Sequence, residues 1–81
     1  MKNLGETIRQ LRKEKKLSQP QLAEQVGVSN GIISAWENNI NEPRASYIKK
    51  LALIFSVSAD YLLGLENEYG VKINSEDVTD K

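Results

Sequence analysis

The amino-acid sequence predicts an all-α fold of five helices. Apolar residues recur three and four positions apart between residues 4 and 63, which is the spacing of one helix face. Ser18, Ser29 and Ser58 precede three of these apolar stretches, and serine is a favoured residue at a helix N-terminus. Gly27 and Gly64 follow two of them, where glycine readily ends a helix. The 81 residues suffice for one domain, which we place at residues 1–64, followed by a tail at 65–81.

The first two helices are predicted over residues 4–16 and 18–27. Apolar residues line one face of the first helix, and basic residues occupy much of the remainder. In the second helix, Ser18 and Gln21 have the spacing of a capping box, in which each side chain bonds the backbone N–H of the other residue. Its predicted buried stripe consists of Leu22, Ala23 and Val26.

A third helix is predicted to start at Ser29, after the connection Gly27-Val28-Ser29. Two helices joined by so short a connection cannot lie antiparallel, so they cross at a large angle, as in a helix-turn-helix. Its predicted inner face consists of Ile33, Trp36 and Glu37. Two asparagines, Asn38 and Asn39, end it, because asparagine tolerates the left-handed conformation better than most residues.

The rest of the chain predicts two more helices and a tail. The fourth helix covers residues 45–55, and its predicted buried residues are Ile48, Leu51, Ala52 and Phe55. The fifth begins at Ser58 and ends at Gly64, and we expect Leu62 and Leu63 to pack inward. In the tail, Tyr69, Val71 and Ile73 alternate with other residues in a strand-like period. Residues 74–81 are polar and predicted to be disordered.

Composition excludes several classes of protein. The chain contains neither cysteine nor histidine, which excludes disulfides, zinc sites built from these residues and the most common general base. We therefore predict no cofactor, no metal and no enzymatic activity. No apolar run approaches the roughly 20 residues that span a bilayer, and the N-terminus lacks the apolar stretch of a signal peptide. These features predict a soluble, cytoplasmic protein without membrane contact.

The net charge of zero conceals an asymmetry. Residues 1–64 carry nine Lys and Arg against six Asp and Glu, a net charge of +3, whereas residues 65–81 carry two against five, a net charge of −3. A basic body suits a polyanionic partner, because phosphates neutralised by the protein release counterions. The alternative is an ordinary solvated surface with a polar tail.

The run from Leu17-Ser18-Gln19 through Trp36-Glu37-Asn38, followed by Pro43, Leu51-Ala52, Val57-Ser58 and Leu62-Leu63, resembles a known family. It is similar to the bacterial and phage helix-turn-helix regulators of the repressor and Cro type, also called the xenobiotic-response-element family. The resemblance covers about residues 4–64. It implies a five-helix lambda-repressor-like domain, with its motif at residues 18–38, in a transcriptional regulator that is either a repressor or an activator. It also implies binding to double-stranded DNA, with helix 29–38 in the major groove.

Carried over by position, the resemblance implies a set of DNA-contacting residues. These are Gln19, Ser29, Asn30, Gly31, Ile32, Ser34, Ala35, Asn38, Asn39 and Arg44. Asn30 suits adenine, and the absence of Arg and Lys among the base-reading positions predicts A·T-rich contacts. Ile32 either contacts thymine methyl groups or packs against the first helix. Arg44 either approaches the minor groove or is simply an exposed first-turn residue.

The resemblance also implies an ion pair between Arg12 and Glu37 that orients the third helix, so Glu37 is structural rather than catalytic.

At three positions the sequence lacks the glycine that often ends a helix in this family. Lys16, Asn39 and Ser56 stand there, and each is expected to be strained in a left-handed conformation.

We predict a homodimer on a palindromic or pseudopalindromic site, because one recognition helix reads only a few base pairs. One candidate interface contains Tyr61, Leu63 and Leu65, and the other is the segment 69–73, by strand pairing between subunits. A loosely packed tail is the alternative for that segment.

A second functional hypothesis is an antitoxin-like module that neutralises a protein partner, because acidic tails can fold onto basic partners.

Overall fold

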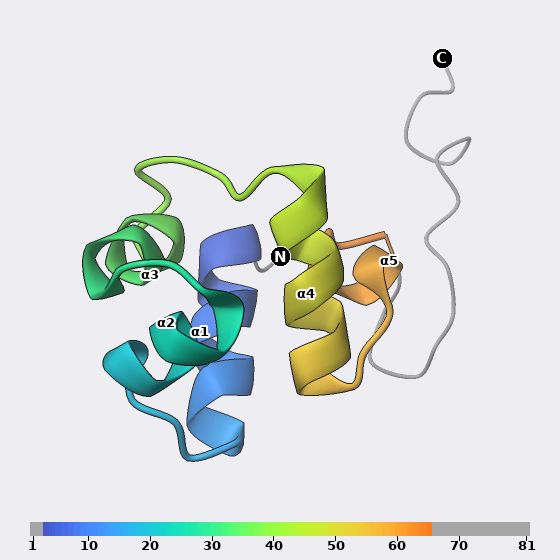
Figure 1. The fold of residues 1–81 in the computed structure, drawn as a ribbon. Helices are drawn as coiled ribbons and strands as arrows, with labels where there is room; N and C mark the ends of the chain where they lie inside the picture. The colour runs from blue at the N-terminus through green and yellow to red at the C-terminus, as the bar shows by residue number, and fades with distance from the viewer. Residues whose placement is uncertain (1–2, 66–81) are drawn as a thin grey trace.

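The computed structural model describes residues 3–65. It contains five α-helices within this range: α1 (Leu4–Glu14), α2 (Gln19–Val26), α3 (Asn30–Glu37), α4 (Ala45–Phe55) and α5 (Ala59–Leu62) (Figure 1). The predicted all-α fold of five helices is therefore confirmed. The strand-like segment 69–73 and the polar segment 74–81 lie outside the described residues.

Side-chain caps start four of the five helices. The Ser18–Gln21 capping box forms as predicted, with the Gln21 N–H 3.1 Å from Ser18 Oγ and the Ser18 N–H 2.8 Å from Gln21 Oε1. Ser29 and Ser58 likewise accept hydrogen bonds from the backbone N–H of the third residue of α3 and of α5, Ile32 and Tyr61. A further capping box between Asn3 and Glu6, which was not predicted, starts α1. These bonds satisfy N–H groups that have no partner within the helix.

Left-handed residues occur at all three positions where strain was expected. Lys16, Asn39 and Ser56 have φ values of 59°, 59° and 58°. The conformation at Lys16 also corrects a boundary, because α1 ends at Glu14 rather than at residue 16. A residue with positive φ reverses the direction of the chain and cannot continue a right-handed helix.

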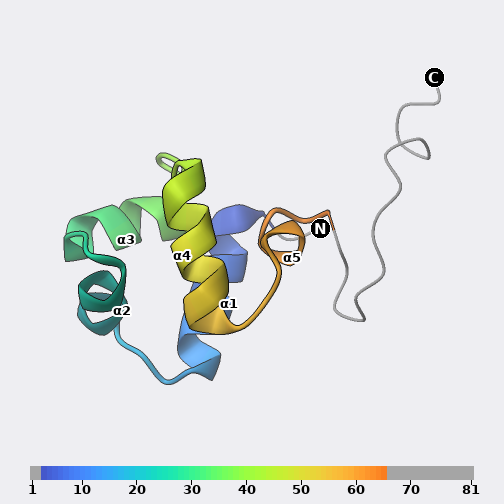
Figure 2. The same ribbon diagram turned by 45° about the vertical axis from the view of Figure 1, so that its right-hand side comes forward.

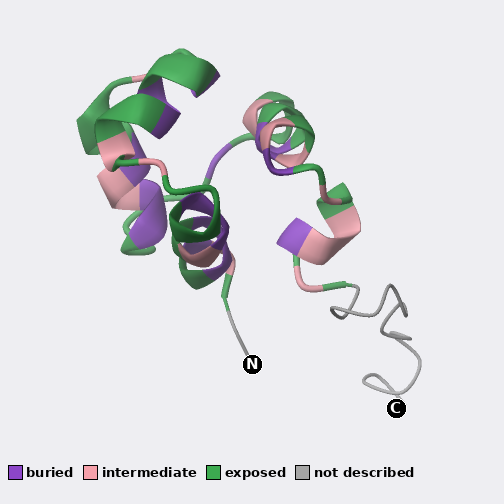
Figure 3. Cartoon of the chain, turned by 90° about the horizontal axis from the view of Figure 1, so that it is seen from below, coloured by how far each residue is buried: buried purple, intermediate pink, exposed green. Residues whose placement is uncertain are grey.

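The core lies where α1 packs against α3, α4 and α5 while α2 packs against α3 and α4. Figure 2 shows α2 and α3 at one end of the molecule and α5 at the other, beyond α4, and Figure 3 shows the buried positions on the inner faces. Ile8, Leu22, Ile33, Leu51 and Leu62 are fully buried.

Two expectations about the core require correction. Leu63 was expected to pack inward, but it is exposed, because it follows Leu62 by one residue and the helix turns it away from the core. Ala52 is half-buried rather than buried, since it lies at the edge of the α4 face that contacts the core.

Candidate nucleic-acid interface

A tight turn joins α2 to α3. Gly27 adopts a φ of 91°, which favours glycine, and the N–H groups of Gly27 and Val28 both donate to the Ala23 carbonyl, at 2.8 and 3.0 Å. Val28 packs against the core from within the turn. Ala23 and Ile33 are buried on the facing sides of the two helices. This turn fixes the angle at which α3 leaves α2.

The N-terminal turn of α3 is open to solvent. Ser29, Asn30, Gly31 and Ile32 are all exposed, whereas Ser34 and Ala35 are half-buried. At Gly31 an added Cβ would meet only the Ser29 Oγ, at 3.9 Å, so packing does not require a glycine there. Four of the predicted DNA-contacting residues are therefore brought together on one accessible turn, whereas the predicted base-reading residue Ala35 is half-buried further along α3.

Ile32 lies beside the loop between α3 and α4. It lines a shallow hollow together with Asn41, Pro43, Arg44 and Tyr47. It is not among the residues packed against the core that contains the α1 face. The alternative in which Ile32 packs against α1 thus receives no support, and its exposed side chain is available to a ligand of α3.

Three of the predicted contact residues are engaged within the protein. Gln19 is half-buried, and its Nε2 donates to Glu37 Oε1 at 3.0 Å. Asn38 Nδ2 donates to the Ser34 carbonyl at 2.9 Å. Asn39 Oδ1 accepts a hydrogen bond from the Gly5 N–H at 3.2 Å. The Gln19 bond joins α2 to α3 and the Asn39 bond joins α1 to the residues that follow α3, whereas the Asn38 bond is local to the end of α3.

Arg44 is the N-cap residue of α4, and its side chain makes no capping hydrogen bond. It is exposed, and its guanidinium carbon lies 5.9 Å from the centre of the Tyr47 ring. An aromatic face at this distance attracts a cation and limits its motion. Arg44 lines the same hollow as Ile32.

A buried ion pair joins α1 to α3. Arg12 Nε lies 2.6 Å from Glu37 Oε2, and Arg12 Nη2 lies 3.1 Å from Glu37 Oε1, so the contact uses both oxygens. The Glu37 side chain is 0% exposed and that of Arg12 11%. Arg12 Nη1 also donates to the Leu17 carbonyl at 2.8 Å, at the connection between α1 and α2. The pair thus holds three segments in a fixed relation.

A second arginine, absent from the predicted site, completes the arrangement. Arg9 Nε lies 3.5 Å from Glu37 Oε1, and its side chain is 46% exposed. Its position one helical turn before Arg12 was the available signal, because residues three apart share a helix face. Arg9 therefore presents a positive charge at the edge of the surface formed by α3.

Burial opposes ionisation of Glu37, but hydrogen bonds from Arg12, Gln19 and Arg9 and the charge of Arg12 outweigh it. The pKa of the Glu37 carboxyl therefore lies below its ordinary value. Glu37 is ionised at neutral pH and serves as a fixed acceptor between α1, α2 and α3.

Across residues 3–65, no group of three or more His, Cys, Asp or Glu is arranged to hold a metal ion. None of the helices in the same range is long and apolar enough to cross a membrane.

The crossed α2 and α3, with an exposed first turn on α3 and a buried brace behind it, define a protein of the helix-turn-helix class. A family model described as Helix-turn-helix matches residues 8–62. The chain belongs to this family, and the match agrees with the expected repressor and Cro type of the fold.

The relatives include proteins with solved structures. Repressor protein C2 of Salmonella phage P22 is 43% identical over 60 residues, which cover 74% of this chain and 28% of that protein. The crystal structure of the P22 c2 repressor in complex with a synthetic operator has a TM-score of 0.74 at 41% identity, over 78% of this chain and 96% of that one. A structure of the SinR–SinI protein complex has a TM-score of 0.72 at 29% identity, over 95% of this chain and 80% of that one.

The chain is short compared with several curated relatives. It spans 28% of the C2 repressor, 30% of the activator BcrR of Enterococcus faecalis and 63% of the regulator YobD of Bacillus subtilis.

Proposed function

We propose that this chain is a sequence-specific regulator of transcription that binds double-stranded DNA, acts in the cytoplasm and has no enzymatic activity. It inserts α3 into the major groove and binds as a homodimer on a palindromic or pseudopalindromic site. The observation that carries this proposal is the exposed turn Ser29–Ile32, held at a fixed angle by the buried Arg12–Glu37 pair. The solved complex of the P22 c2 repressor with operator DNA supports it, because that protein shares the fold and 41% of the aligned residues.

The exposed turn of α3 supplies the base contacts in this proposal. Asn30 can bond adenine through its amide, and Ile32 can contact a thymine methyl group, since both base edges face the major groove. The backbone at Gly31 can approach the bases closely, because no side chain intervenes. With neither Arg nor Lys on this turn, we expect A·T base pairs at the contacted positions.

Phosphate contacts come from the two edges of the motif. The backbone N–H groups at the N-terminus of α2 lie on one side, and Arg44 lies on the other. Arg9 adds a third positive group beside the C-terminal end of α3. These contacts fix the register of α3 without reading sequence.

A selection of bound duplexes from a random pool, followed by fluorescence anisotropy, tests the proposal. We expect A·T-rich half-sites and a logarithm of affinity that falls with the logarithm of salt concentration by about 0.9 per phosphate contact. Asn30→Ala should weaken binding to the selected site by about 1–3 kcal/mol, roughly 5- to 150-fold.

The matched control is Gln10→Ala, which removes an amide from α1 outside the motif and should leave affinity unchanged. G-rich half-sites would contradict the assignment of base contacts to Asn30 and Ile32. Affinity that does not depend on salt would contradict DNA binding itself.

A second candidate function is neutralisation of a protein partner by an antitoxin-like module, which uses the acidic tail. A protein partner is supported by the structure of the SinR–SinI complex, one chain of which matches 95% of this chain. Purification of the chain from its own host distinguishes the two functions. A stoichiometric second protein that is lost on deletion of residues 66–81 would support the partner-binding role.

A further inference from the structure

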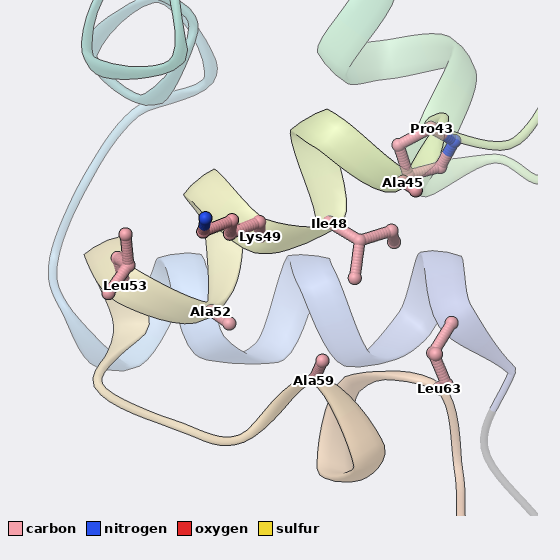
Figure 4. A pocket seen from close by; sticks show the side chains of 8 residues that line it. All are labelled: Pro43, Ala45, Ile48, Lys49, Ala52, Leu53, Ala59 and Leu63. Carbon is pink, nitrogen blue, oxygen red and sulfur yellow. The ribbon is translucent and has the colours of Figure 1, made fainter.

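An apolar groove lies between α4 and α5. One wall consists of Ala45, Ile48, Ala52 and Leu53 of α4, and the other consists of Ala59 and Leu63 (Figure 4). The groove encloses about 500 Å³. Leu53 is 72% exposed and Leu63 49%. The exposed leucines beside the groove offer apolar surface that another segment can cover.

The chain itself continues from this groove. Leu63 lines it, and the described residues end two positions later at Leu65, which is also exposed. Sixteen residues, 66–81, follow. Four residue steps separate Leu65 from Tyr69, a reach of up to about 14 Å. The segment 69–73, which lies outside the described residues, is therefore within reach of the groove.

The segment and the groove agree in length and apolar pattern. From Ala45 to Leu53 the α4 wall rises by eight residue steps, about 12 Å. An extended segment from Tyr69 to Ile73 spans four steps, about 13 Å. In that conformation Tyr69, Val71 and Ile73 lie on one face.

Charge also favours docking of the tail in this groove. Lys49 lines the groove and is exposed. Glu66 and Glu68 lie immediately before Tyr69 in a tail of net charge −3, whereas residues 1–64 carry +3. The segment itself carries Lys72, but Glu66 and Glu68 beside it have charges opposite to that of Lys49, which favours docking in low salt.

Covalent attachment favours docking of the chain's own segment in the groove over docking of the same segment from a second copy. A short flexible linker gives an attached segment an effective concentration of order 1 mM. A second copy present at about 10 µM competes at a roughly 100-fold disadvantage.

We propose that residues 69–73 dock in the groove between α4 and α5 of the same chain, with Tyr69, Val71 and Ile73 against Leu53 and Leu63. The inference does not rest on DNA binding.

The absence of cysteine from the chain allows a direct test. Ala59→Cys places one thiol in the groove at an exposed position, and its alkylation rate by iodoacetamide is measured in the full chain. The same variant with Val71→Ser and Ile73→Ser removes the apolar contacts without changing residues 3–65. Gln25→Cys, exposed on α2, is the matched control in both backgrounds.

A groove covered nine-tenths of the time slows alkylation about tenfold. We therefore expect the double serine substitution to raise the rate at Ala59→Cys about tenfold and to leave the rate at Gln25→Cys unchanged. Equal rates at Ala59→Cys in the two backgrounds would overturn the proposal. Protection that increases with protein concentration would also overturn it, because it would assign the groove to a second copy.

Discussion

Replacing Glu37 with glutamine tests the role of the buried ion pair most directly. Glu37→Gln preserves the shape of the side chain but removes its charge and turns an amide N–H₂ group toward donors. Arg12 then keeps its bond to the Leu17 carbonyl at 2.8 Å but loses its counter-charge in a site where only 11% of its side chain is exposed. The expected result is a large loss of stability rather than a local change.

The magnitude follows from burial. Removing one partner of a buried pair costs about 3–5 kcal/mol, and the partial exposure of Arg12 favours the lower end. A domain of 63 described residues has a total stability of about 3–9 kcal/mol. Glu37→Gln should therefore lower the free energy of unfolding by about 3 kcal/mol, which corresponds to a fall in Tm of roughly 12–24 °C.

Trp36 provides the assay. It is the only tryptophan, it is 4% exposed and it precedes Glu37 in α3, so its fluorescence follows unfolding in urea. Glu24→Gln, on the exposed face of α2, is the matched control and should change stability by less than about 0.5 kcal/mol. Replacing both partners, as Arg12→Met with Glu37→Met, should cost less than Glu37→Gln alone, because no charge is left buried without a partner.

A Glu37→Gln variant within about 1 kcal/mol of the Glu24→Gln control would refute the reasoning, since a loss of that size is typical of an exposed ion pair. A double variant less stable than Glu37→Gln would refute the part that concerns the unpaired charge.

Three further predictions concern the stability of the domain in acid, alanine at Gly5 and Gly31, and glycine at Ser56. The lowered pKa of Glu37 means that its contribution to stability is fully present above the unfolded value of about 4.3 and is lost as pH falls through the folded pKa; urea titrations across this range should show a steeper acid loss in the parent chain than in Glu37→Gln. Gly5→Ala should cost about 1–3 kcal/mol, because its Cβ would lie 2.5 Å from the Trp36 carbonyl, whereas Gly31→Ala should raise stability by about 0.5–1 kcal/mol; equal Tm values for the two variants would contradict the close approach of α1 to α3. Ser56→Gly should raise stability by about 0.5–1 kcal/mol by relieving a φ of 58°, and thermal melts in which Ser56→Ala gains as much would show that backbone strain is not the cause.

Local signals in the sequence predicted the helices well. Ser18 with Gln21, and Ser29 before the third helix, cap α2 and α3 as their spacing indicates, because a cap depends on residues only two or three positions apart. The fifth helix has only four residues, too few for periodicity to separate Leu62 from Leu63. Packing of α5 against α1 and α4 therefore decides which of the two leucines is buried.

The candidate site was predictable only in part, since some of its contacts join distant residues. The exposed turn at Asn30 follows from the position of Ser29 and the inner face of α3. The bond from Gly5 to Asn39 joins residues 34 positions apart, and that from Gln19 to Glu37 joins residues 18 apart. Nothing local in the sequence indicates either bond, so the engagement of Gln19 and Asn39 within the protein required the structure.

The exposed first turn of α3 has a consequence for how such a domain evolves. Asn30 and Gly31 are exposed to solvent, and a Cβ atom added at Gly31 would lie 3.9 Å from its nearest neighbour, the Ser29 Oγ. Stability resides instead behind the turn, in Ile33, Trp36 and Glu37, which are buried. Substitutions at Asn30 and Gly31 therefore leave the buried contacts of α3 unchanged, so under the proposed function new DNA preferences can be sampled one residue at a time on the same scaffold.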